Sequence, residues 1–169
     1  VLTHGNLLAN ARSLTEAWGF TDKDVLLHAL PLFHVHGLFI AMGCALLSGA
    51  SVIFQSRFDG AAVLEALPRA TVFMGVPTYY TRLLADPAFT PACAPAVRLF
   101  VSGSAPLLPE TFNQFTERMG QPILERYGMT ECGVIASNPL QGARKAGAVG
   151  PGLPGMEVRV VDEAGGPVA

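Results

Sequence analysis

The sequence is poor in charged residues and in cysteine. Only 14% of its 169 residues are charged, and the formal net charge is −2. A chain without a basic surplus is not expected to bind nucleic acid or an anionic membrane. The three cysteines, Cys44, Cys93 and Cys132, show no Cys-x-x-Cys spacing. They argue against a zinc site or a disulfide framework and favour reduced thiols in a cytoplasmic protein.

Long hydrophobic runs are also missing. The longest, around residues 37–47, is too short to cross a bilayer and suits a buried helix better. Half of the residues are nevertheless apolar, which excludes disorder and suffices for the core of one ordinary domain. No segment resembles a signal peptide, and the first residue is Val1 rather than methionine. We therefore expect the chain to be a piece of a longer protein.

Strand and helix patterns alternate along the chain. Short apolar runs predict strands at residues 25–30, 51–54, 71–75, 97–101 and 122–124. Helical patterns occur at residues 7–18, after His36, and at residues 61–67, 77–84 and 108–119. Asn6 is expected to cap the first helix and Gly19 to end it. This alternation predicts an α/β fold, with a mostly parallel sheet flanked by helices and joined by right-handed crossovers.

The alternation lapses after Gly128. Residues 142–155 carry five glycines and two prolines, a composition typical of a loop. Residues 156–161 then alternate as a half-exposed strand would. We therefore divide the chain into an α/β portion at residues 1–155 and the start of a following β subdomain at residues 156–169.

Four polar clusters follow predicted strands, at residues 31–37, 75–82, 102–106 and 127–131. The carboxyl ends of parallel strands share one edge of a sheet, and ligands bind in the crevice at that edge. Taken singly, each cluster is explained as well by an ordinary turn after a strand. Their shared location favours a single binding site.

The last of these clusters has residue types that suit a nucleotide. Tyr127 offers a flat face for a base, Thr130 a hydroxyl for phosphate oxygens, and Glu131 a hard oxygen ligand of the kind that Mg²⁺ prefers. The small residues at 102–106 let backbone groups approach a flat ligand closely. Together the two clusters indicate a nucleotide crevice.

The first two clusters contain candidates for recognising an acid. His34 and His36 have no third metal ligand nearby, so a neutral imidazole beside a reacting carboxylate or acyl group is the better interpretation. For His36, a histidine bonded to backbone at a helix start is an equal alternative. Arg82 lies one helical turn after Thr78, and a guanidinium in an apolar cleft fits a carboxylate. The alternative for Arg82 is an exposed helix arginine.

The order of the motifs resembles a known family. Pro-Leu-Phe-His-Val-His-Gly, Val-Pro-Thr-Tyr-Tyr, Ser-Gly-Ser-Ala-Pro and Glu-Arg-Tyr-Gly-Met-Thr-Glu follow one another as in the adenylate-forming superfamily of acyl-CoA synthetases. Within it, the chain looks like the malonyl-CoA synthetase (malonate–CoA ligase) branch. The resemblance covers nearly the whole chain. It implies an enzyme that activates malonate or methylmalonate with ATP and Mg²⁺ to an acyl-adenylate. Transfer to coenzyme A then gives malonyl-CoA, AMP and pyrophosphate.

The resemblance also implies roles for single residues. His34, Thr130 and Glu131 would be catalytic, with Glu131 holding Mg²⁺. The nucleotide would contact Gly103, Ser104, Ala105, Pro106, Glu125, Arg126, Tyr127, Gly128, Met129 and Thr130. The acid would be bound by Arg82, Ser104, His36, Met42 and Val134, with Arg82 and Ser104 on its distal carboxylate. Cys132 stands where relatives often have threonine, which leaves the choice among malonate, methylmalonate and bulkier diacids open.

Other parts of the family's site are expected outside this stretch. The phosphate loop would precede Val1, and the hinge and mobile C-terminal domain would follow Ala169. We therefore expect this piece alone to be inactive, with a carboxylate, ATP, coenzyme A and the rest of its own chain as partners. The alternatives are a ligase for a monocarboxylic (fatty or aryl) acid, an amino-acid-activating domain, and a non-catalytic nucleotide-binding module.

Overall fold

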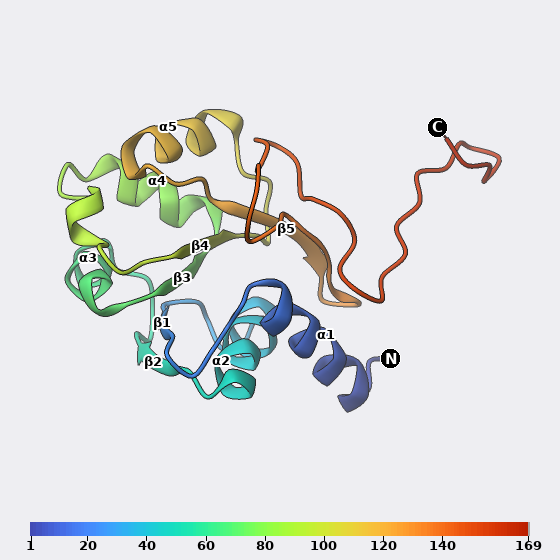
Figure 1. Ribbon diagram of the computed structural model, residues 1–169, viewed down its shortest axis with the longest axis horizontal. Coiled ribbons are helices and arrows are strands. Elements are labelled where there is room, and N and C mark those ends of the chain that lie inside the picture. The colour runs from blue at the N-terminus through green and yellow to red at the C-terminus, as the bar shows by residue number, and fades with distance from the viewer. Residues whose placement is uncertain (169) are drawn as a thin grey trace.

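The structure, a computed structural model, describes residues 1–168. Its centre is a six-stranded sheet in the order β2-β1-β3-β4-β5-β6 (Figure 1). The strands are β1 (Val25–His28), β2 (Ser51–Phe54), β3 (Val72–Gly75), β4 (Leu99–Ser102), β5 (Leu124–Met129) and β6 (Gly133–Ser137). Neighbours from β2 to β5 pair in parallel, whereas β6 pairs antiparallel with β5. The predicted α/β class with a mostly parallel sheet is confirmed.

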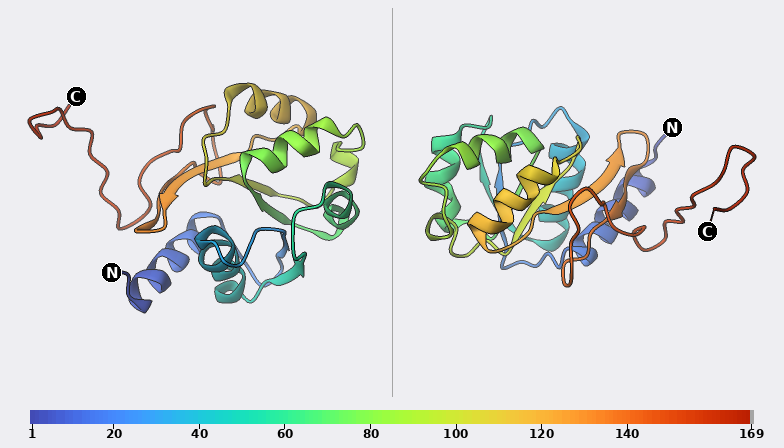
Figure 2. Two further views of the ribbon diagram at one scale, coloured as in Figure 1. Left: turned by 180° about the vertical axis from the view of Figure 1, so that it is seen from behind. Right: turned by 90° about the horizontal axis from the view of Figure 1, so that it is seen from above.

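Helices cover both faces of this sheet (Figures 1 and 2). One face carries α1 (His4–Ala17), the π-helix η1 (His36–Ala41) and α2 (Met42–Ser48). The other carries α3 (Gly60–Ala66), α4 (Pro77–Ala85) and α5 (Pro109–Met119). Two short 3₁₀ helices, η2 (Leu67–Arg69) and η3 (Pro91–Cys93), lie in the connections between these elements. Within residues 1–168, every helix is too short or too polar to cross a bilayer.

Alternate residues of the central strands supply two separate cores. Leu27 and Phe73 pack under α3, α4 and α5, whereas their neighbours Leu26 and Val72 pack under α1 and α2. All four are fully buried. This is the period of two that a strand buried on both faces must show. Because a slip of one residue would exchange the two cores, the register of the sheet is fixed and so are the loops at its ends.

The first helix begins earlier than its apolar pattern predicts. Its cap is Thr3, whose hydroxyl accepts from the N–H of Asn6 at 3.2 Å, while the Asn6 side chain accepts from the N–H of Thr3 at 2.9 Å. This reciprocal pair is a capping box with asparagine in the usual place of glutamate. The prediction of Asn6 as the cap is therefore wrong. The expected end is confirmed, since α1 stops just before Gly19, which has a positive φ of 58°.

The fifth strand is displaced and longer than predicted. Instead of residues 122–124, β5 spans Leu124–Met129, so the Glu-Arg-Tyr-Gly-Met sequence lies within it. The chain turns at residues 130–132 and returns as β6, a hairpin that the apolar pattern did not predict. Gly128, expected at a turn, lies beside a bulge in β5. A Cβ there would overlap the carbonyl oxygen of Gly133, so glycine permits the close approach of the two strands.

The end of the chain leaves the body of the molecule (Figures 1 and 2). Residues 156–160 are extended and exposed, and the nearest approach to a strand is an isolated bridge between Val161 and Pro167. The predicted strand at 156–161 is wrong, because no neighbouring strand within the described residues pairs with it. The assignment of residues 156–169 to a following subdomain stays a prediction, and Ala169 lies outside the described residues.

The ends of the parallel strands define an amino edge and a carboxyl edge of the sheet. At the amino edge, Asp24 accepts hydrogen bonds from Nε and Nη2 of Arg98, both at 2.8 Å, and from the Thr71 hydroxyl at 2.7 Å. These residues directly precede β1, β4 and β3. Burial opposes the charged form of Asp24, but the hydrogen bonds outweigh burial and lower its pKa to about 2. The network ties the starts of three strands together.

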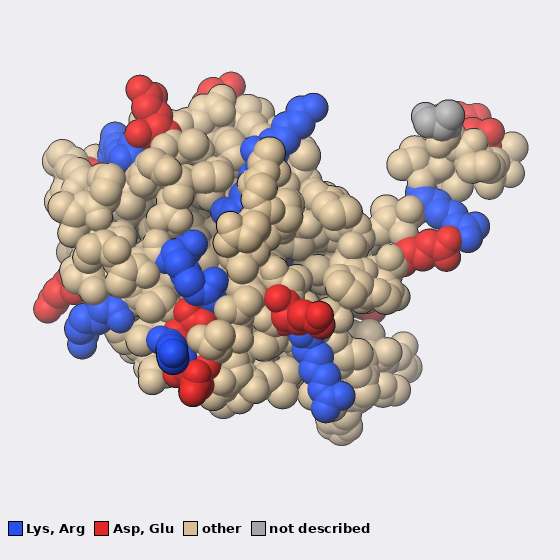
Figure 3. All heavy atoms as spheres, in the orientation of Figure 1, with Lys and Arg blue, Asp and Glu red and all other residues tan. Residues whose placement is uncertain are grey.

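Charge is sparse on the surface. On the face shown in Figure 3, basic and acidic side chains lie singly or in small mixed groups among uncharged residues. The absence of nucleic acid and of an anionic membrane among the partners stays a prediction from the net charge of −2.

Candidate functional site

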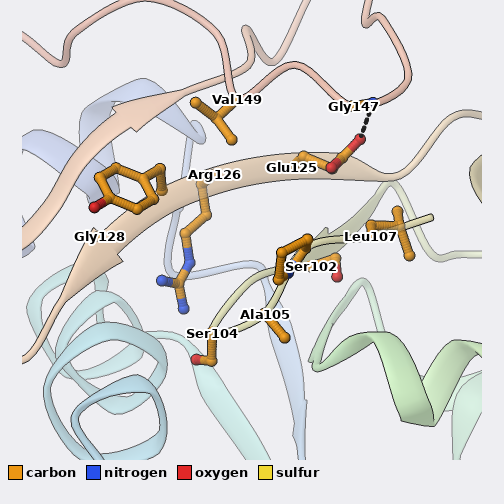
Figure 4. Close-up of a pocket in the computed structure, with 11 residues that line it drawn as sticks. Ser102, Ser104, Ala105, Leu107, Glu125, Arg126, Gly128, Gly147 and Val149 are labelled. Carbon is orange, nitrogen blue, oxygen red and sulfur yellow. Dashed lines mark hydrogen bonds between the residues drawn. The ribbon is translucent and has the colours of Figure 1, made fainter. Parts of the chain in front are cut away.

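Two adjoining cavities lie at the carboxyl edge. The β4–β5 cavity, of about 290 Å³, is lined by Ser102, Ser104, Ala105, Pro106, Leu107, Glu125, Arg126, Tyr127, Gly128, Gly147 and Val149 (Figure 4). The hairpin cavity, of about 230 Å³, is lined by His34, Val35, Ile40, Ser104, Arg126, Gly128, Met129, Thr130 and Glu131. Because Ser104, Arg126 and Gly128 line both, the cavities adjoin one another. The loops after β1 and β4 therefore meet the β5–β6 hairpin, as predicted for three of the four polar clusters. The fourth, at residues 75–82, lines neither cavity.

Arg126 lies at the junction of the cavities without a partner for its charge. The residue is 5% exposed, and its Nε and Nη2 are buried without a hydrogen bond within residues 1–168. Burial lowers its pKa to about 10, which leaves the guanidinium charged at neutral pH. A buried unpaired charge costs several kcal/mol, and a guanidinium N–H donates a strong, charge-assisted hydrogen bond to a carboxylate or phosphate. The junction is therefore suited to an anion.

The loop after β4 is shaped around Arg126. A Cβ at position 103 would overlap Nε and Cζ of Arg126, so Gly103 is needed for the guanidinium to lie where it does. Figure 4 shows this side chain reaching from β5 toward Ser104. Ser104 has a φ of +69°, the one positive value among the non-glycine residues of the described chain. Backbone strain of this kind concentrates at functional sites.

The hairpin turn brings Thr130 and Glu131 into the hairpin cavity. Asn10 of α1 holds this hairpin, since its Nδ2 donates to the Val134 carbonyl at 2.7 Å and its Oδ1 accepts from the Val134 N–H at 3.1 Å. The side chain of Val134 is fully buried. Two hydrogen bonds between α1 and the start of β6 thus fix the position of the turn.

The donor set around Glu131 fits magnesium better than a metal that needs a protein cage. Within residues 1–168, no three His, Cys, Asp or Glu side chains gather as ligands. Mg²⁺ is usually held by one or two carboxylates, substrate phosphates and water. Glu131 is exposed and could supply the single carboxylate of such a site.

The two histidines of the loop after β1 take different positions. His34 is exposed and lines the hairpin cavity. His36 is 1% exposed and lines neither cavity, but its Nδ1 lies 3.1 Å from Oγ of Ser104. Burial, and next the positive charge of Arg126, lower the pKa of His36 well below its usual value. His36 is therefore neutral, and it reaches the site only through Ser104.

Glu125 joins the cavity to the loop at residues 142–155. Its Oε1 accepts from the N–H of Gly147 at 3.2 Å (Figure 4). Burial raises the pKa of Glu125, and this hydrogen bond opposes the rise. Gly147 and Val149 consequently form part of the wall of the β4–β5 cavity.

Comparison with known proteins identifies the family. The profile of a family described as "AMP-binding enzyme" matches residues 1–169. This chain belongs to the AMP-binding enzyme family.

Members of the family that resemble it include ligases for malonate. The malonate–CoA ligase ACSF3 of Mus musculus, named as mitochondrial, is 42% identical over 177 residues, covering 95% of this chain and 30% of the relative. The crystal structure of ATP-bound MatB from Rhodopseudomonas palustris is 49% identical with a TM-score of 0.97, covering 99% of this chain and 34% of that one. A ternary product complex of a malonyl-CoA ligase with methylmalonyl-CoA and AMP is 38% identical with a TM-score of 0.85, covering 91% and 34%. The chain thus spans about a third of the length of these relatives.

Most residues that the family resemblance assigns do gather at the two cavities. The three catalytic candidates, His34, Thr130 and Glu131, line the hairpin cavity together. Of the nucleotide set, Ser104, Ala105, Pro106, Glu125, Arg126, Tyr127 and Gly128 line the β4–β5 cavity, and Met129 and Thr130 line the hairpin cavity. Gly103 lines neither and instead makes room for Arg126.

Of the residues that the resemblance assigns to the acid, only Ser104 lines a cavity. Arg82 is exposed on α4 and lines neither cavity, and its guanidinium has no hydrogen bond or ion pair among residues 1–168. The inward face of α4 is formed by Tyr80, Leu83 and Leu84, which leaves Arg82 on the outer side. Met42, half-buried in α2, also lines neither cavity. The prediction that Arg82 enters the cleft is therefore not met by this structure, in which Arg126 is the buried arginine that lines both cavities.

Some residues of the site carried no signal in the sequence of this AMP-binding chain. Ser102 lies in the cluster at residues 102–106 and Leu107 directly follows that cluster, but neither residue type indicates a role. Gly147 and Val149 lie in a glycine-rich loop whose composition predicts a turn and nothing about what it touches. Asn10 is one of many polar helix residues, and only the fold reveals its hydrogen bonds to Val134.

Proposed function

We propose that the protein containing this chain is an ATP-dependent, AMP-forming ligase that joins malonate or methylmalonate to coenzyme A. The observation that carries the choice of a diacid is Arg126, a buried guanidinium at the junction of the two cavities whose Nε and Nη2 have no hydrogen-bond partner within residues 1–168. A diacid has one carboxylate to react and a second to pair with this charge. The malonate ligases among the relatives support the same substrate class.

In the first half-reaction, a carboxylate oxygen of the acid attacks the α-phosphorus of ATP, and the bond to pyrophosphate breaks. The β4–β5 cavity would hold the nucleotide, with the half-exposed ring of Tyr127 beside the base. Thr130 would donate a hydrogen bond to a phosphate oxygen. Holding two anions together is the main demand of this step, and fixed donors meet it. Glu131 would hold Mg²⁺, which supplies charge neutralisation at the phosphates when bound.

In the second half-reaction, the thiol of coenzyme A attacks the acyl carbonyl and AMP leaves. His34 is the exposed imidazole of the hairpin cavity, where it would lie beside the reacting carboxylate and then move aside for the thiol. Arg126 and Ser104 would keep the distal carboxylate in place through both steps. Arg82, which is exposed on α4 and lines neither cavity, has no part in this scheme.

The rest of the chemistry depends on parts outside these residues. We propose that a phosphate loop and a mobile C-terminal domain, supplied by the same polypeptide, complete the site, and that residues 1–169 alone turn nothing over. A location in the cytoplasm is also part of the proposal; the mouse relative is named mitochondrial.

A ligase for a monocarboxylic acid is the main alternative within the same chemistry. In that case Arg126 would face a phosphate oxygen of the nucleotide, and removing it would weaken all acids equally. A non-catalytic nucleotide-binding module is disfavoured, because it would have no use for Thr130 and Glu131 beside His34 in one cavity.

A substrate panel on the full-length protein tests the proposal. We expect AMP release to be fastest with malonate or methylmalonate, slower with succinate, and slowest with acetate and octanoate. Fastest turnover with a monocarboxylate would overturn the diacid assignment and leave the ligase chemistry standing. No AMP release with any acid, in a protein that binds ATP, would favour the non-catalytic module.

A further inference from the structure

Ser104 and Arg126 are the two polar side chains that line both cavities. A guanidinium can only donate hydrogen bonds, whereas a serine hydroxyl can donate or accept. What Ser104 offers a ligand therefore depends on the partner that it has within the protein. That partner is His36, whose Nδ1 lies 3.1 Å from Oγ of Ser104.

The surroundings of His36 decide which ring nitrogen carries the proton. The residue is 1% exposed, and Nε2 has no hydrogen-bond partner among residues 1–168. A proton on Nε2 would leave a buried N–H unpaired, which is rarer and costlier in proteins than an unpaired acceptor. A proton on Nδ1 is instead donated to Ser104, and only a lone pair on Nε2 stays unpaired. Burial and the nearby charge of Arg126 keep the ring neutral by lowering its pKa.

We propose that His36 is a positioning residue that makes Ser104 a hydrogen-bond donor toward the distal carboxylate of the substrate. With Nδ1–H bonded to a lone pair of the Ser104 oxygen, the hydroxyl proton is directed into the cavity. Ser104 and Arg126 then present only hydrogen-bond donors to the substrate. A carboxylate accepts from these donors, whereas a methyl group in the same place would leave them buried and unpaired, which costs binding free energy. The identity of the acid rests on the proposed function, whereas the tautomer of His36 does not.

The local backbone holds this pair in place. Ser104 has the strained φ of +69°, which is maintained only where surrounding contacts require it. His36 begins the π-helix η1, a form found frequently at functional sites. The next residue, Gly37, packs so closely that a Cβ would overlap the Pro31 carbonyl oxygen. The His36 ring therefore has little freedom to leave Ser104.

The test compares malonate with propionate, its monocarboxylate counterpart, in the full-length protein. We expect His36→Leu to lower kcat/KM for malonate by about ten- to a hundredfold, the range for a lost hydrogen bond to a charged group, mainly through KM. Propionate should be nearly unaffected. His36→Asn, whose amide N–H can replace Nδ1–H, should restore most of the malonate activity. In a Ser104→Ala background, His36→Leu should add no further loss.

Two further measurements keep the outcome decisive. His28→Leu is the matched control, since His28 is also a buried histidine and both its ring nitrogens lack partners within residues 1–168; it should not change the ratio of malonate to propionate activity. ¹⁵N spectra of histidine-labelled parent protein report the tautomer directly, even where a variant does not fold. A proton on Nε2 of His36, or an equal loss on both acids, overturns the inference. A parent without preference for malonate overturns the proposed function instead, while an Nδ1–H tautomer would still be read from the spectra.

Discussion

The two edges of the sheet treat their charged groups in opposite ways. At the amino edge, Asp24 is buried and both of its carboxylate oxygens accept hydrogen bonds. The donors are Arg98 and Thr71, which lie at the starts of neighbouring strands. At the carboxyl edge, Arg126 is equally buried and its Nε and Nη2 have no partner within the described residues. Both edges are built from the same parallel strands, so topology does not account for the difference.

The contrast teaches what each edge contributes. The lowered pKa of Asp24 shows that its hydrogen bonds stabilise the folded state, and a carboxylate whose oxygens are already bonded offers nothing to a ligand. An unmatched buried charge instead destabilises the free protein and strengthens binding of an anion. The unpaired Arg126 and the strained Ser104 are both at the carboxyl edge. We therefore expect substitutions at this edge to change activity first and substitutions at the amino edge to change stability first.

The largest expected effect is at Arg126. Arg126→Met in the full-length protein should lower kcat/KM for malonate by about a hundred- to a thousandfold, as expected for removing one partner of a buried ion pair worth about 3–5 kcal/mol. The folded state should lose no stability, because the charge is unpaired without ligand. Steady-state kinetics and thermal unfolding measure the two quantities. Arg82→Met is the matched control for an exposed arginine and should have the smaller effect; the reverse order would contradict the assignment.

A smaller effect is expected at Gly103. A Cβ at this position would overlap Nε of Arg126, and the guanidinium would have to move. Gly103→Ala should therefore lower malonate kcat/KM by about ten- to a hundredfold, the cost of misplacing a positioned group, with little change in unfolding. Gly60→Ala is the control, since nothing lies within 4 Å of its Cβ position. Unchanged kinetics in Gly103→Ala would show that Arg126 does not need its present position.

Asp24 is the position where we expect the smallest effect on activity. A substitution there should instead lower the free energy of unfolding. Its folded pKa of about 2 lies below its ordinary value of 3.8, so the stabilisation is complete above about pH 4 and is lost as the pH falls toward 2. Asp24→Asn should lower the free energy of unfolding at pH 7 by about 2 kcal/mol and flatten its acid dependence, with kcat/KM unchanged. Denaturant unfolding at several pH values measures this.

The control for Asp24 is the exposed pair of Glu157 and Arg159, whose side chains are 72% and 71% accessible. Glu157→Gln should change unfolding by less than about 1 kcal/mol, because solvent screens such pairs. If Asp24→Asn lowered kcat/KM under conditions where the variant is still fully folded, the two edges would not differ in the way that we infer.

Much of the fold could be predicted from local pattern. Strands β1 to β4 and the helices between them follow from apolar runs and their periods, with errors of at most two residues at the ends. The errors lie where other residues decide. Residues 156–161 alternate like a strand, yet no strand within residues 1–168 pairs with them. Strand β5 continues past Leu124 because β6 returns beside it.

The site was predicted by location more securely than by residue. Polar clusters after parallel strands converge on one edge, which is a consequence of strand direction and needs no side-chain detail. Which arginine enters the cleft is a different matter. Arg82 and Arg126 both lie within such clusters or beside them, and only the packing of α4 and β5 buries one and exposes the other.

The sequence alone determined the α/β class and the edge of the sheet at which the polar clusters gather, since these depend on apolar period and on the order of strands along the chain. The tertiary structure decided that Arg126 is buried between the two cavities, that the His36 ring lies against the Ser104 hydroxyl, and that Asn10 holds the hairpin. The reason is physical: burial and hydrogen-bond pairing are properties of what surrounds a residue, and those surroundings come from segments as far apart as Asn10 and Val134.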